Sequence, residues 1–174
     1  MYLVSIYFDA GTDQKIRKMM KQSADKSGNF CMIDNNVPPH ITLSAFESRC
    51  EQEIIEKLDG VAAELKKGNL QWVSVGQFMP GVVFLSAVLN EYLHKLSTAV
   101  YEGIKDIRDI SVSRFYRPFQ WMPHTTIAKK LTKEEMNAIC MVLQNQFGMF
   151  QGQVIRIGIA KTNPYRDIKV WDLL

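Results

Sequence analysis

Two short segments of the chain repeat one pattern, in which a proline and a histidine are followed by any residue, a threonine and an apolar residue. The copies are Pro39–Leu43 and Pro123–Ile127, and His124 lies 84 positions after His40. Because side chains alternate faces along a strand, a histidine and a threonine two positions apart point the same way. Each copy therefore presents one imidazole and one hydroxyl side by side.

The repetition extends beyond the two motifs. Each copy is followed by an amphipathic helical pattern and then by a strand-like run with an apolar-Gly step, at Val75-Gly76 and at Ile157-Gly158. The spacing from histidine to glycine is 36 positions in the first half and 34 in the second. This recurrence predicts a duplicated unit, whose pseudo-two-fold axis would bring equivalent strands to one shared cleft.

Hydrophobic periodicity predicts that strands and helices alternate along the chain. Strands are expected at residues 2–8, 40–46, 70–78, 82–88, 124–130, 153–162 and 168–173. Helices are expected at residues 13–27, 51–67 and 90–107, and a capping box of Thr132 and Glu135 opens a fourth. Residues 28–39 and 109–123 are predicted loops, and Met79-Pro80-Gly81 and Asn163-Pro164-Tyr165 are predicted turns. Residues 1–174 are predicted to form one α+β domain of two intertwined lobes.

Composition limits the classes of partner and compartment. The net charge of +3, from 21 Lys+Arg against 18 Asp+Glu, is too small to indicate non-specific binding of duplex DNA, although it suits a small anion or an RNA end. No apolar stretch is long enough to span a bilayer, and no N-terminal run fits a signal peptide. Cys31, Cys50 and Cys140 have no metal-like spacing and indicate reduced thiols, so the expected location is the cytoplasm. A monomer is expected, although no sequence feature addresses assembly.

The paired His-x-Thr-apolar motifs, their separation and the order of elements around them resemble the 2H phosphoesterase superfamily, which includes the 2′-5′ RNA ligase-like and cyclic nucleotide phosphodiesterase families. The resemblance covers nearly the whole chain. It implies a bilobed α+β fold, in which two antiparallel sheets line a central cleft and the helices lie outside. It also implies that the catalytic residues are His40, Thr42, His124 and Thr126.

Two imidazoles suit the hydrolysis of a 2′,3′-cyclic phosphate. With pKa values near ~6.5, one can activate water while the other protonates the leaving sugar oxygen. The threonine hydroxyls would donate hydrogen bonds to the non-bridging oxygens. This chemistry needs no nucleophilic side chain, no metal and no cofactor. The sequence does not say which histidine is the base.

Other residues are expected to bind the substrate, a nucleotide or an RNA terminus. The loop before the second motif interleaves arginines with aromatic residues, which suits a phosphate and a stacked base, and within it we single out Tyr116 and Arg117. Tyr165, in the late turn, could join the same rim. Lys129 occupies a place where the ligase-like branch usually carries arginine, so bidentate phosphate contact is not expected there.

Strand parity complicates the placement of Lys129. It is an odd number of positions from His124 and Thr126, so only a twist or a bulge would turn it into the cleft. Lys129 and Lys130 alternate faces, so at most one of them should point there. The candidate substrates are RNA with a 2′,3′-cyclic end, 2′-5′ linked oligonucleotides and ADP-ribose cyclic phosphate, and reversible ligation is a further expectation of the resemblance.

Two other functions stay open. The motif histidines could ligate a metal, but catalytic zinc needs at least three protein ligands, and no Asp, Glu or Cys lies within two positions of His40 or His124. The cleft could instead belong to a non-catalytic module that binds RNA ends or nucleotides without turnover. The third histidine, His94, falls in the middle of a predicted helix and is expected to be structural.

Overall fold

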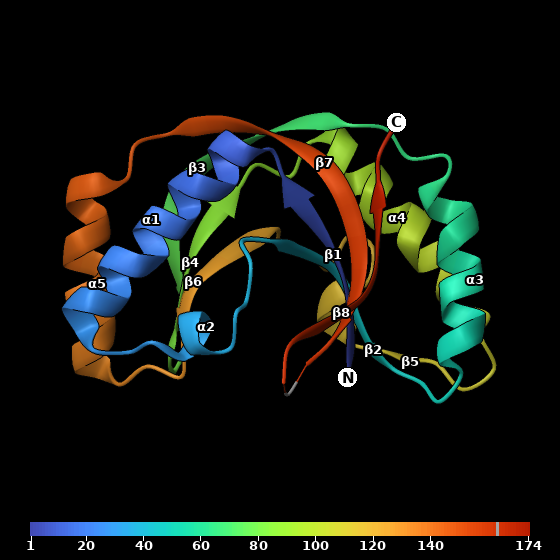
Figure 1. Ribbon diagram of the computed structural model, residues 1–174, viewed down its shortest axis with the longest axis horizontal. Coiled ribbons are helices and arrows are strands. Elements are labelled where there is room, and N and C mark those ends of the chain that lie inside the picture. Colours follow the sequence, from blue (N-terminus) through green and yellow to red (C-terminus); the bar gives the residue numbers. More distant parts are fainter. Residues whose placement is uncertain (163) are drawn as a thin grey trace.

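One antiparallel sheet organises the chain. The computed structural model describes residues 1–162 and 164–174, and within them the strand order is β5-β2-β1-β7-β3-β4-β6, with β8 paired to β7 (Figure 1). The strands are β1 (Tyr2–Phe8), β2 (Ile41–Glu47), β3 (Gly68–Phe78), β4 (Val82–Ala87), β5 (Ser111–Val112), β6 (His124–Lys129), β7 (Phe150–Lys161) and β8 (Arg166–Asp172). The predicted α+β class and the antiparallel pairing are confirmed.

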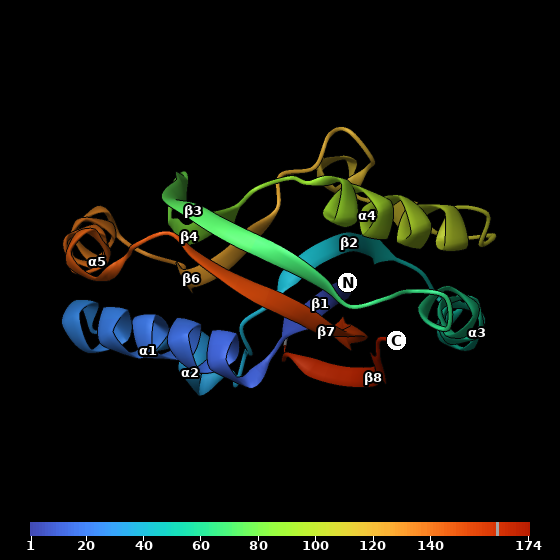
Figure 2. The same cartoon turned by 90° about the horizontal axis from the view of Figure 1, so that it is seen from above.

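The two expected sheets are joined into one. The strands β3 and β7 have 11 and 12 residues and pair with each other over Gly68–Trp72 and Phe150–Val154. Beyond this shared stretch β3 pairs with β4, and β7 pairs with β1 and β8. Figure 2 shows β3 and β7 side by side across the middle of the molecule. The sheet is therefore continuous because its two longest strands each serve both halves.

The helices are α1 (Ala10–Ser27), α2 (Cys31–Asp34), α3 (Glu51–Ala62), α4 (Glu91–Ile104), η1 (Arg114–Tyr116) and α5 (Lys133–Gln146). The helix α1 packs against α5, and α3 packs against α4, and the two pairs lie at opposite ends of the molecule (Figure 1). Among the described residues, no helix combines the length and the apolar character that crossing a membrane requires.

The strand order supports the predicted duplication. The order from β2 to β6 has two matching halves that run in opposite directions, in which β2 corresponds to β6, β1 to β4 and β7 to β3. The elements β1-α1-β2-α3-β3 and β4-α4-β6-α5-β7 then form two successive units of the same kind. The pseudo-two-fold relation itself stays a prediction.

Several predicted boundaries move for identifiable reasons. The helix predicted from residue 13 begins at Ala10, because the Asp9 carboxylate accepts a hydrogen bond from the Thr12 amide at 3.0 Å. The helix predicted to run to residue 67 ends at Ala62, and the next strand already includes Gly68. There the Lys67 amide donates to the Leu174 carbonyl at 2.9 Å instead of continuing a helix.

Other predictions change in smaller ways. The predicted loop over residues 28–39 contains α2, and the predicted loop over residues 109–123 contains β5 and η1. The turn at Met79-Pro80-Gly81 connects β3 to β4 as expected, and both bonds of the Thr132–Glu135 capping box are present. The predicted turn at residues 163–165 includes Asn163, which lies outside the described residues.

Candidate active site

Both motifs line one pocket. The strands β2 and β6 stand far apart in the strand order, yet they contact each other because the sheet curves. A pocket of about 250 Å³ opens there. It takes side chains from both halves of the chain: Met1, Leu3, Cys31, Met32, Asn35, Val37, His40, Thr42, Tyr116, His124, Thr126, Lys129, Lys130, Thr162 and Tyr165. Each motif therefore contributes its histidine and its threonine to one space.

The two motif strands carry matching bulges. In β2, Thr42 pairs with Ser5 and Ser44 with Val4, so Leu43 is skipped. In β6 the register skips Ile127 in the same way, because Thr126 pairs with Phe84 and Ala128 with Val83. An extra unpaired residue shifts the facing of every residue after it. The bulge at Ile127 thus turns Lys129 into the pocket despite its odd spacing from Thr126.

Both lysines line the pocket, so the prediction that at most one of them would do so is wrong. The backbone of Lys130 has a φ of 59°, in the left-handed region, at the residue where β6 has just ended. That conformation interrupts the alternation of side chains. Lys129 and Lys130 thus both line the pocket that holds the histidines, and the charge of Lys129 acts on His40.

The imidazoles are held in the same way. His40 lies one residue before β2, not in the strand as predicted, and its Nδ1 is 2.7 Å from the Pro38 carbonyl oxygen. The Nδ1 of His124 is 2.9 Å from the Met122 carbonyl oxygen. A carbonyl only accepts, so both Nδ1 atoms donate and both Nε2 atoms are left free to exchange protons.

Burial lowers the pKa of both imidazoles, because it disfavours the charged form. For His40 the Pro38 carbonyl and the Asp167 carboxylate oppose this shift, while positive charge on His124 or Lys129 lowers the pKa further. The Met122 carbonyl opposes the shift at His124. Both rings consequently favour the neutral form more than a solvent-exposed imidazole does.

An indole donor braces each motif strand. Trp121 donates from Nε1 to the Thr42 carbonyl at 2.9 Å, and Trp72 donates to the Thr125 hydroxyl at 3.1 Å. The Thr42 side chain is only 6% exposed, and its hydroxyl lies 3.4 Å from the Ser5 hydroxyl. The Trp121 bond thus fixes the backbone at Thr42, and the Trp72 bond fixes the side chain of Thr125, the residue before Thr126.

The predicted binding residues divide into two groups. Tyr116, Lys129 and Tyr165 line the pocket, whereas Arg117 is exposed and is not among the lining residues of the described chain. Cys31 and Asn35 line the pocket without having been predicted. They come from α2 and the residue after it, inside a predicted loop, and no motif marks them.

A tyrosine pair and a carboxylate adjoin His40. The hydroxyls of Tyr7 and Tyr165 are 2.8 Å apart, and both lie 3.0 Å from Oδ1 of Asp167. The Tyr165 ring is 6.1 Å from the His40 ring, between centroids. Burial raises the pKa of Tyr7 and of Tyr165, so both phenols stay protonated and can donate.

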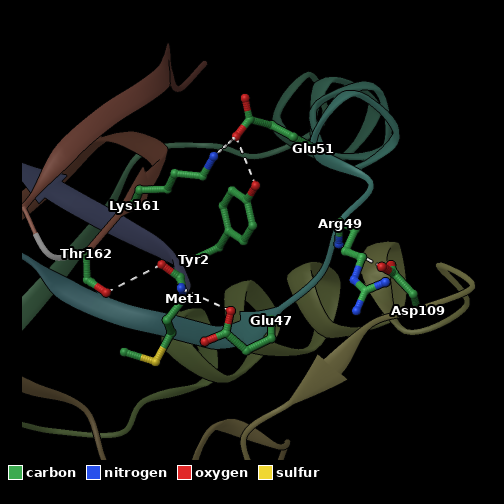
Figure 3. A network of polar contacts seen from close by, with 8 residues as sticks. All are labelled: Met1, Tyr2, Glu47, Arg49, Glu51, Asp109, Lys161 and Thr162. Carbon is green, nitrogen blue, oxygen red and sulfur yellow. Dashed lines mark hydrogen bonds and ion pairs between the residues drawn. The ribbon is translucent and has the colours of Figure 1, made fainter.

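Polar contacts also tie the rim of the pocket together (Figure 3). The amino group of Met1 pairs with the Glu47 carboxylate at 3.0 Å, and the Thr162 hydroxyl donates to the Met1 carbonyl at 3.4 Å. Next to them, Glu51 accepts a hydrogen bond from Tyr2 at 2.9 Å and pairs with Lys161 at 2.6 Å. These contacts join β1, β2, α3 and β7 where Met1 and Thr162 line the pocket.

The donor set does not favour a metal. Among the described residues, no group of three or more His, Cys, Asp or Glu side chains is placed to hold an ion. His94 does not line the pocket, and its ring packs on Phe119 with 4.5 Å between centroids. The chain's three cysteines are free thiols.

Known proteins are similar to this chain in sequence or in fold. A model of the 2′-5′ RNA ligase superfamily matches residues 11–165. A protein of Bacillus licheniformis that is named as a phosphoesterase is 26% identical over 113 residues, which cover 62% of each chain. Two solved structures each cover 99% of this chain, and the match covers 97% of each of their own chains. TT0787 of Thermus thermophilus has a TM-score of 0.65 and is 11% identical to this chain. Escherichia coli LigT complexed with 3′-AMP has a TM-score of 0.63 and is 16% identical.

Proposed function

The chain belongs to the 2′-5′ RNA ligase superfamily, and from that premise we propose that it is a metal-independent phosphodiesterase. Its substrates would be 2′,3′-cyclic phosphates or 2′-5′ linked nucleotides, either free or at an RNA terminus. One observation carries the proposal: two imidazoles with free Nε2 atoms line the same pocket as two threonines and two lysines. The complex of E. coli LigT with 3′-AMP supports a nucleotide as the bound species.

In this mechanism His40 and His124 are the proton-transfer groups. One neutral imidazole takes a proton from water, whose oxygen attacks phosphorus, while the other imidazole, protonated, gives its proton to the departing sugar oxygen. Each such transfer typically contributes about 10²–10⁴-fold to the rate. With the hydroxyl of a second RNA end in place of water, the same two proton transfers would form its oxygen–phosphorus bond and break one ester bond of the 2′,3′-cyclic phosphate, whose sugar oxygen takes the proton; this is the expected ligase activity.

The hydroxyls and ammonium groups act on the phosphate itself. Thr42 and Thr126 would donate to its non-bridging oxygens, where charge shifts during in-line displacement. Lys129 and Lys130 would offset the negative charge and hold the ester between the imidazoles. Family precedent favours a 2′-phosphate product. We further propose that residues 1–174 act as one monomeric domain, and that they act in the cytoplasm, because three free cysteines suit a reducing compartment.

The experiment compares three histidine variants. His40→Ala and His124→Ala are expected to reduce turnover of adenosine 2′,3′-cyclic phosphate and of 2′-5′ linked diadenosine at least a hundredfold. His94→Ala is the matched control, since that ring does not line the pocket, and it should keep wild-type rates. A chelator should leave the wild-type rates unchanged. Near-normal turnover by either motif variant would refute the proposal, and tight binding without turnover by the wild type would favour a binding module.

A further inference from the structure

A second cavity opens beside the active-site pocket. This groove has a volume of about 560 Å³ and shares His124 and Tyr116 with the pocket. The rest of its lining comes from the end of β3 and the turn after it, and from η1 and the loop before β6: Phe78, Met79, Phe115, Gln120, Trp121 and Met122. His40 is not among the described residues that line it. The two cavities therefore meet at one of the two histidines only.

The groove and the pocket differ in charge. Within the described chain, no Lys, Arg, Asp or Glu lines the groove, whereas Lys129 and Lys130 line the pocket. Arg114 packs its guanidinium on Phe115 at 4.8 Å without lining the groove. An unpaired charge would lose hydration in such a site without gaining a partner. The groove thus suits a group that carries no charge.

Large apolar side chains are exposed around the groove. Met79 is 78% exposed and Phe115 is 64% exposed, and Phe78 and Met122 are also exposed. Clusters of exposed apolar side chains mark surfaces that bind something. Aromatic rings and flexible thioethers pack well on a flat aromatic group, and stacking on a base is sequence-tolerant. The shape and the chemistry together point to one aromatic ring system.

The histidine at the junction faces one aromatic residue of the groove, Phe78, and one buried ring behind it, Phe84. The Phe78 ring meets the His124 ring edge to face, with 4.9 Å between centroids, and the Phe84 ring lies at 5.4 Å. His40 instead adjoins Tyr165 inside the pocket. A substituent that extends from the phosphate into the groove would pass Tyr116 and His124, which line both cavities, so its ester oxygen would lie nearer to His124 than to His40.

We propose that the groove binds an uncharged aromatic arm of a linear phosphodiester, and that this arm is the leaving group. The inference rests on the proposed function and narrows it. Water gives a proton to Nε2 of His40, and its oxygen bonds to phosphorus. The bond from phosphorus to the arm's oxygen breaks, and that oxygen receives the proton of His124. The products are a phosphomonoester in the pocket and a neutral alcohol, such as a nucleoside, in the groove.

The first test varies the arm and keeps the rest of the substrate constant. Three esters of adenosine 2′-phosphate carry adenosine (through its 5′ oxygen), methyl or p-nitrophenyl as the leaving arm. The adenosine arm is expected to exceed the methyl arm in kcat/KM by about tenfold or more, because it stacks in the groove. A further phosphate on that adenosine should reduce kcat/KM by a similar factor. Equal values for the adenosine and methyl esters would overturn the proposal.

Two variants locate the effect in the groove. Phe115→Ala should remove most of the preference for adenosine over methyl, measured as a ratio of kcat/KM values. Met149→Ala is the control, since Met149 is 70% exposed and lies outside the groove, and it should keep the ratio. A ratio that Phe115→Ala leaves unchanged would count against the groove as the binding site.

The acid role of His124 has its own signature. A p-nitrophenolate departs without protonation, so His124→Gln should lose at least tenfold less activity on the p-nitrophenyl ester than on the adenosine ester. His40→Gln should lose about the same on both. If His40→Gln, instead of His124→Gln, loses less activity on the p-nitrophenyl ester, then His40 is the acid and the leaving arm lies on its side of the phosphate, which overturns the proposal.

If the wild type hydrolyses adenosine 2′,3′-cyclic phosphate but no linear ester, this inference fails and the proposed function stands. If it hydrolyses neither, the proposed function fails.

Discussion

A methyl group at Gly76 should test how the fold supports His124. Gly76 of β3 pairs with Phe84 of β4, and the Phe84 ring lies across the glycine. A Cβ at position 76 would come within 2.6 Å of Cε2 of that ring and closer still to Cζ. The ring is buried, stacks on Phe78 with 4.2 Å between centroids and faces His124. The Gly76→Ala variant must therefore displace a packed ring that contacts the proposed acid.

The expected cost follows from two opposing terms. Overpacking a core costs about 1–3 kcal/mol. Replacing glycine by alanine returns about 0.4–1 kcal/mol, because it restricts the unfolded chain. We expect a net loss of about 1–2 kcal/mol in the free energy of unfolding. For a chain of this size 1 kcal/mol shifts Tm by about 2–4 °C, so Tm should fall by about 2–8 °C.

Urea unfolding of four variants isolates the cause. Gly60→Ala is the control, because nothing lies within 4 Å of a Cβ at this position of α3, and alanine there should stabilise the helix by up to about 1 kcal/mol. Phe84→Leu and its combination with Gly76→Ala complete a double-mutant cycle. The cost of Gly76→Ala should largely disappear in the leucine background. An unchanged cost there, or a Gly76→Ala protein as stable as the wild type, would refute the steric argument.

Three further predictions concern the site and its surroundings. Burial lowers the pKa of both motif histidines, so the imidazole that acts as base stays neutral to lower pH, and the imidazolium that acts as acid loses its proton at lower pH. The pH profile of kcat/KM should therefore peak below about pH 6.5. A pH optimum above neutrality would contradict this. Lys129→Met should raise KM by about tenfold. Because Lys129 lowers the pKa of His40, the variant should also move the part of the pH profile that His40 sets to higher pH. The control variant Lys133→Met, at the exposed start of α5, should change neither KM nor the pH profile. Tyr7→Phe removes a buried hydroxyl 3.0 Å from Asp167 and should lower the free energy of unfolding by about 1 kcal/mol in urea titrations; no loss would mean that water replaces the bond fully.

The sequence predicted the elements that periodicity encodes. The apolar run at residues 2–8 is a central strand buried on both faces, and the paired β3 and β4 flank the predicted turn. The glycines of the two apolar-Gly steps have a packing reason, because Phe84 covers Gly76 and Tyr7 covers Gly158. The apolar run and the turn depend on neighbours along the chain, so they can be predicted without the fold, whereas the packing reason for each glycine comes from a ring on another strand.

Features that depend on the partner strand could not be predicted from the sequence. A bulge at Leu43 or Ile127 arises only when a neighbouring strand fixes the register, and no residue type indicates it. Likewise, no sequence signal predicts the left-handed backbone conformation of Lys130. Arg117 was predicted from loop composition alone, which indicates a kind of surface but not the direction in which a given side chain points.

The two halves supply equal histidines and threonines but unequal surroundings, and in the proposed mechanism this inequality would allow two distinct chemical roles. Across the sheet, Thr42 pairs with Ser5, whereas Thr126 pairs with Phe84. The first pairing places a hydroxyl 3.4 Å from the Thr42 hydroxyl, and the second places an aromatic ring beside His124. A polar neighbour suits the side of the phosphate where water arrives, and an apolar wall suits the side from which an uncharged alcohol departs. Under the proposed function, the residues next to the motifs would thus give the reaction its direction, while the motifs themselves stay alike.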